Sequence, residues 1–145
     1  MPEPTPEPGP APGPDPPDEA AVQELATKVF SLARAGDAAA LAAYLDAGVP
    51  ANLTNDRGDT LVMLAAYHGH AAAVRGLLER GADPGRANDR GQTPLAGAVF
   101  KGEPEVVRVL LDGGADPGAG HPSAIDTARM FGNDEFLAWF AEENA

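Results

Sequence analysis

The sequence contains no cysteine among its 145 residues. This absence excludes a disulfide framework, cysteine-based zinc sites, iron–sulfur clusters and thiol catalysis. The first Lys or Arg along the chain is Lys28, so the N-terminus lacks the basic residues of a secretory signal peptide. The chain also lacks the run of about 18 apolar residues that would span a bilayer. We therefore expect a cytoplasmic protein that does not bind membranes.

Basic residues are scarce as well. The chain has 10 Lys and Arg against 22 Asp and Glu, a formal net charge of -12. Phosphates of nucleic acids and anionic lipids would be repelled by such a chain rather than neutralised. We expect no nucleic-acid partner.

Large apolar side chains are few once alanine is set aside. The chain has 29 Ala, which leaves 34 larger apolar side chains to build a core. This balance disfavours a thick, multilayered sheet protein. It favours helices, because alanine loses no rotamer freedom in a helix and lets neighbouring helices approach closely.

The N-terminal segment 1–18 differs from the rest of the chain. It contains nine of the fifteen prolines and no large apolar side chain after Met1. This composition predicts a disordered, solvated, acidic tail. The alternative is a proline-rich ligand for an aromatic groove, although such ligands commonly have a flanking Arg or Lys, which this segment lacks. Asp18 is a candidate helix cap, and apolar residues at helical spacing then follow from Val22 to Ala33.

A single sequence unit repeats along the remainder. Asp56-Arg57-Gly58 returns 33 positions later as Asp89-Arg90-Gly91. Two glycine series keep the same phase, namely Gly36, Gly69 and Gly102, and Gly48, Gly81 and Gly114. Repeats of this length are too short to bury their own apolar faces, so they predict a solenoid of stacked units.

The helices and turns expected in each unit can be inferred from its own residues. Thr60 and Thr93 are suited to cap a first helix, and Pro94 suits its first position because proline lacks a donor that is not needed there. A second helix then ends at Gly81 or Gly114, where glycine can adopt the left-handed conformation. The Asp-Pro and Asp-Arg-Gly segments that remain favour turns.

Four features recur together and in the same phase: the turn, the helix cap, the inter-helix glycine and the Gly-Ala-Asp segment. This combination resembles the ankyrin repeat. The resemblance covers roughly residues 20–145. It implies an all-α ankyrin-repeat solenoid of about four helix-turn-helix units joined by β-turn or hairpin loops. The expected divisions are a tail over 1–18 and a repeat domain over 19–145, with an N-terminal capping unit at 19–54, repeats at 55–87 and 88–120, and a C-terminal capping unit at 121–145.

The sequence also departs from the family pattern. The family's Thr-Pro-Leu-His helix start appears as Thr60-Leu61-Val62-Met63 and as Thr93-Pro94-Leu95-Ala96, so the histidine that supports the adjoining turns is missing twice. In the last unit, Ser123 and Asp126 form a capping-box pattern. We expect most of the aromatic and Met side chains near the C-terminus to close the stack; they are Met130, Phe131, Phe136, Trp139 and Phe140.

Candidate chemistry is sparse. His68 and His70 are two apart but lack a third and fourth ligand, which favours a surface His68 and a structural His70 over a metal site. Glu103 and Glu105 flank Pro104 at a helix start, where carboxylates stabilise the helix end. We expect no enzyme activity, no cofactor and no metal.

Resemblance to ankyrin repeats implies a binding surface made of turn tips and the exposed side of the first helices. The corresponding partner-binding residues are Arg57, Asp59, Tyr67, His68, Arg90, Gln92, Phe100 and Lys101. Tyr67 and Phe100 occupy equivalent positions in consecutive repeats and have two possible roles. They are either contact residues for a partner or core residues folded over the adjacent helices.

Three function classes follow. The first is a monomeric, non-catalytic module that binds a partner protein through the concave surface and turn tips, with the net charge favouring a basic partner. The alternative is a regulatory or immunity-type inhibitor that occludes the active site of an enzyme or toxin. A catalytic or small-ligand role is third.

Overall fold

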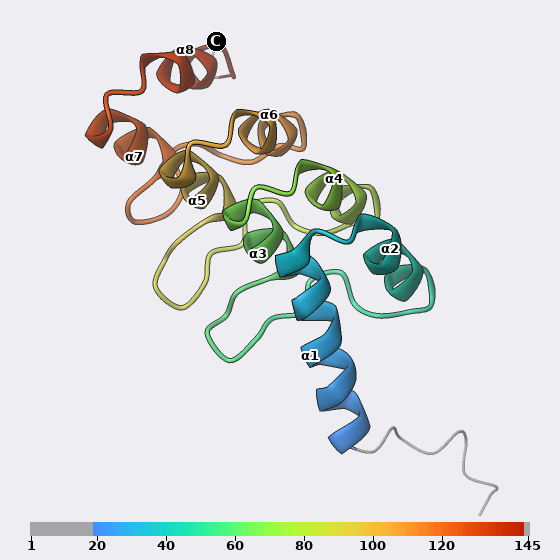
Figure 1. Ribbon diagram of the computed structural model, residues 1–145. Helices are drawn as coiled ribbons and strands as arrows, with labels where there is room; N and C mark the ends of the chain where they lie inside the picture. The colour runs from blue at the N-terminus through green and yellow to red at the C-terminus, as the bar shows by residue number, and fades with distance from the viewer. Residues whose placement is uncertain (1–18, 144–145) are drawn as a thin grey trace, which may run out of the picture.

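The computed structural model describes residues 19–143, which form eight α-helices (Figure 1). They are α1 (Glu19–Ala35), α2 (Ala38–Asp46), α3 (Leu61–Tyr67), α4 (Ala71–Glu79), α5 (Pro94–Lys101), α6 (Pro104–Asp112), α7 (Ala124–Met130) and α8 (Asp134–Glu143). The all-α solenoid is confirmed. The predicted cap at Asp18 and the predicted character of the tail lie outside the described residues.

The first helix of each later unit begins at the predicted cap. The Thr60 hydroxyl accepts the backbone N–H of Met63 at 3.0 Å, and the Thr93 hydroxyl accepts that of Ala96 at 3.2 Å. Ser123 likewise accepts the N–H of Asp126 at 3.1 Å. These caps satisfy backbone N–H groups that have no partner within the helix. The three predicted caps are confirmed.

The second helices also end as predicted. Gly81 and Gly114, which follow the ends of α4 and α6, have φ values of 89° and 95°. A side chain is disfavoured in this left-handed region because its Cβ crowds the backbone. Glycine therefore sets both boundaries.

The hairpins between units are held without the missing histidine. The side-chain carbonyl of Asn55 accepts the N–H groups of Arg57 and Asp59, both at 3.0 Å. Asn88 does the same in the next hairpin, for Arg90 and Gln92. Neighbouring hairpins are joined by the backbone, because Asp89 N–H donates to the Arg57 carbonyl at 3.0 Å and His121 N–H donates to the Gly91 carbonyl at 2.9 Å.

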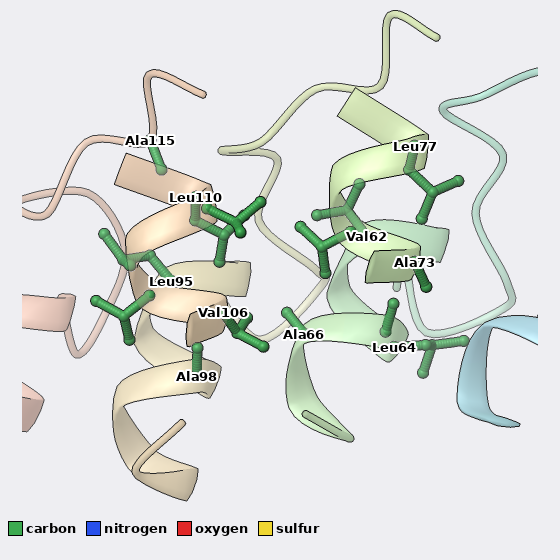
Figure 2. Packing of buried hydrophobic residues seen from close by; sticks show 14 of the residues in the cluster. Val62, Leu64, Ala66, Ala73, Leu77, Leu95, Ala98, Val106, Leu110 and Ala115 are labelled. Carbon is green, nitrogen blue, oxygen red and sulfur yellow. The ribbon is translucent and has the colours of Figure 1, made fainter. Parts of the chain in front are cut away.

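The helices pack in two layers. The odd-numbered helices α1, α3, α5 and α7 follow one another in one layer, and α2, α4 and α6 follow one another in the other (Figure 1). Each unit contributes small and branched side chains to a continuous core, as Figure 2 shows for two neighbouring units. Leu77 is buried, whereas the adjacent Leu78 is only half-buried and lies close to Gly113.

Aromatic side chains of α8 close the C-terminal end of the stack. In α8, Phe136 and Phe140 are buried, and the Arg108 guanidinium lies 4.0 Å from the ring centroid of Trp139. Met130 and Phe131, in contrast, are exposed and do not close the stack.

Helix α1 buries its apolar face only along its second half. Val29 and Ala33 are buried, but Val22 and Leu25 are exposed because α1 extends beyond the helices it packs against (Figure 1). The predicted helical spacing is confirmed, and the structure adds that only the second half of the apolar face is buried.

Candidate protein-binding groove

A groove of about 670 Å³ runs along the side of the stack formed by the first helices and the hairpins. Residues from α1, α3, α5 and α7 and from three hairpins line it. Because consecutive units are displaced by one repeat, equivalent positions of each unit form rows along the groove.

The structure brings the predicted contact residues together. Seven of them line the groove: Arg57, Asp59, Tyr67, His68, Arg90, Gln92 and Phe100. The eighth, Lys101, lies at its edge, where its Nζ is 5.0 Å from the ring centroid of Tyr67. Residues far apart in the sequence thus form a single surface.

The two aromatic residues of the groove are exposed rather than core. Tyr67 is 37% exposed and Phe100 is 54% exposed. The Phe100 ring also contacts that of Phe131 edge to face, with centroids 5.6 Å apart. Tyr67, Phe100 and Phe131 are exposed, as is Met130. Together they form an apolar strip across the ends of α3, α5 and α7.

Gly97 shapes the bottom of the groove, a role that the sequence analysis missed. A Cβ at Gly97 would lie 3.4 Å from Met63 Cε and 3.7 Å from Tyr67 Cδ2. The equivalent position one repeat earlier is Leu64. Gly97 therefore lets Met63 and Tyr67 pack closely against α5, and the signal for it is a glycine within a predicted helix.

Asp59 and Gln92 have a structural role as well. Asn88 Nδ2 donates to Asp59 Oδ1 at 2.8 Å and to Gln92 Oε1 at 2.9 Å. The bond to Asp59 joins two hairpins, and the bond to Gln92 lies within one hairpin. Both use acceptors that a partner would otherwise contact. The recurrence of Asn55 as Asn88 one repeat later was the sequence signal for this network.

The histidines differ in their surroundings. His70 Nε2 lies 2.7 Å from the backbone carbonyl of Arg34, which supports its predicted structural role. His68 is exposed, and its pKa is lowered by partial burial first and then by the nearby His70, Lys101 and Arg34. Among residues 19–143, no group of three or more His, Asp or Glu side chains is placed to hold a metal ion.

The paired helices, hairpins and groove define a helical repeat protein. Residues 29–120 match the family model for ankyrin repeats in three copies, so the chain belongs to the ankyrin repeat family. Ankyrin repeats are generally protein–protein interaction modules.

Two similar proteins support this assignment. An ankyrin repeat protein of Pseudomonas aeruginosa is 48% identical over 46 residues, which are 32% of this chain and 27% of that protein. The crystal structure of the human ASB11 ankyrin repeat domain superposes with a TM-score of 0.71 at 29% identity, covering 81% of this chain and 54% of that one. The chain thus spans only part of both relatives. Within its described residues, no helix is both long and apolar enough to cross a membrane.

Proposed function

We propose that this chain is a non-catalytic module that binds a partner protein in the groove. The observation that carries the proposal is the exposure of Tyr67 and Phe100 beside Arg57 and Arg90 on one concave surface. Exposed apolar side chains that are gathered in one patch and rimmed by polar residues often mark a site of protein–protein interaction. Tyr and Arg are also enriched among the residues that contribute most to binding free energy.

The stacked units support a rigid binding surface. The core is continuous from unit to unit, and the hairpins are joined by backbone hydrogen bonds. A surface that is already ordered loses little conformational entropy when it binds. The groove therefore has both the side chains and the rigidity of an interface.

The test begins with affinity capture by the full chain from the cells that produce it, followed by titration of the purified partner. Tyr67→Ala and Phe100→Ala should each weaken binding by about 1 to 4 kcal/mol, because each truncation removes buried contact area. Ala72→Ser, on an exposed face of α4 outside the groove, is the matched control and should bind as the wild type does.

Unfolding measurements separate binding from folding. Leu77→Ala should destabilise the chain by about 2 to 5 kcal/mol because it leaves a cavity in the core. Tyr67→Ala and Phe100→Ala should cost less. Unchanged partner affinity in both aromatic variants would refute the groove as the binding site.

A further inference from the structure

The charge of the groove differs from that of the whole chain. Three of the ten basic residues line it, Arg34, Arg57 and Arg90, whereas only three of the 22 acidic residues do, Asp56, Asp59 and Asp89. The formal charges of the lining therefore cancel, so the groove lacks the net negative charge of the whole chain.

The acidic and basic side chains of the groove differ in their contacts within the protein. Asp59 is half-buried and already accepts a hydrogen bond from Asn88. The three arginines are exposed. Among residues 19–143, the ion pairs are Arg80 with Asp46 and Arg129 with Asp126, so none involves an arginine of the groove.

Two observations concern the cationic side chains at one end of the groove. Lys101 lies beside the Tyr67 ring at the edge of the groove. The pKa of His68 is lowered in part by Lys101 and Arg34, which indicates that cationic groups converge at this end. With Lys101 at its edge, the groove has four cationic side chains and three carboxylates.

The cations and aromatic rings form two rows. Arg34, Tyr67 and Phe100 follow one another at intervals of one repeat and occupy equivalent positions on α1, α3 and α5. Arg57 and Arg90 form the second row on the hairpins. A chain lying between the rows would meet a guanidinium on either side and an aromatic ring in each of two units.

We propose that the groove binds an extended acidic segment of the partner protein, whose carboxylates pair with Arg34, Arg57 and Arg90 while its apolar side chains cover Tyr67 and Phe100. The proposal rests on the protein-binding function above. This occupant differs from the basic partner that the net charge alone favours. Arginine suits this task because its planar donors can bind a carboxylate through two hydrogen bonds. The acidic remainder of the surface would repel such a segment, which restricts it to the groove.

The experiment is a selection from a random dodecapeptide library on the full chain. Enriched peptides should be rich in Asp and Glu and poor in Lys and Arg. One enriched peptide is then titrated beside its counterpart in which Asn and Gln replace Asp and Glu, at low and high salt. The acidic peptide should bind more tightly, and its advantage should shrink as salt screens the charges.

Variants of equal net charge locate the effect. Arg34→Gln, Arg57→Gln and Arg90→Gln should each weaken binding of the acidic peptide by about tenfold, the scale of a charge-assisted hydrogen bond. Arg75→Gln and Arg86→Gln remove the same charge from exposed positions outside the groove and should change binding by less than about twofold.

Three results would overturn the proposal. They are enrichment of neutral or basic peptides, absence of any enriched peptide, and equal losses for arginines inside and outside the groove. None of these three results bears on the proposal that the chain binds a partner protein. That proposal is tested by capture of the partner and by the Tyr67 and Phe100 variants, so the two proposals can fail independently.

Discussion

Gly97 shows how one residue sets the shape of the groove. It lies within α5, where glycine is unfavourable for a helix, and its place in the preceding repeat is taken by Leu64. Met63 and Tyr67 pack against the position where a side chain would begin. Helix stability is thus lower at a position that lines the groove.

Gly97→Ala should raise the free energy of unfolding by about 0.5 to 1 kcal/mol, because alanine loses less backbone freedom than glycine in a helix. The new Cβ would meet only the flexible end of Met63 at close range. Urea unfolding measures the change.

Gly76→Ala in α4 is the matched control, since its Cβ would approach only the Arg80 side chain. It should stabilise the chain similarly and leave partner binding unchanged. A loss of stability in Gly97→Ala alone would mean that Met63 and Tyr67 cannot adjust.

At the level of the elements, the two central helix pairs each have a side-chain cap at the start and a left-handed glycine after the end. Thr60, Thr93 and Ser123 cap the first helices, while Gly81 and Gly114 follow the second ones. These signals are local, which explains why element boundaries follow closely from the sequence.

Gly81→Val and Gly114→Val should each destabilise the chain by at least about 1 kcal/mol. Nothing lies within 4 Å of the Cβ that either change would add, so the cost is backbone strain at positive φ rather than a clash. Urea unfolding of both variants, with the exposed Ala72→Ser as a near-neutral control, measures it. Wild-type stability in both valine variants would contradict the left-handed helix ends.

At the level of the whole molecule, the units are stable because they stack. Contacts run between successive units in both helix layers, and the hairpins add backbone hydrogen bonds between units. The described core runs from Val29 in α1 to Phe140 in α8.

Deleting residues 1–17 should leave the melting temperature within about 2 °C, because this segment has no large apolar side chain after Met1 to contribute to a core. Calorimetry of the full and shortened chains provides the measurement. A larger decrease would show that these residues contact the repeats.

The sequence by itself determined the repeat length, the caps, the left-handed glycines and the set of residues that share the concave side. All of these depend on interactions between near neighbours or on the phase of the repeat, both of which can be read along the chain. This explains why seven of the eight predicted contact residues line one groove.

Only the tertiary structure decided which of those residues are exposed and which are hydrogen-bonded to other residues. Exposure of Tyr67 and Phe100 depends on how closely α3, α5 and α7 pack, and Gly97 of α5 lies against Tyr67 of the preceding unit. Asp59 accepts from Asn88 because neighbouring hairpins stack, and the exposed start of α1 reflects where its packing partners end. The net charge of the chain likewise gave no indication of the arginines along the groove, because local charge depends on which distant residues the stack brings together.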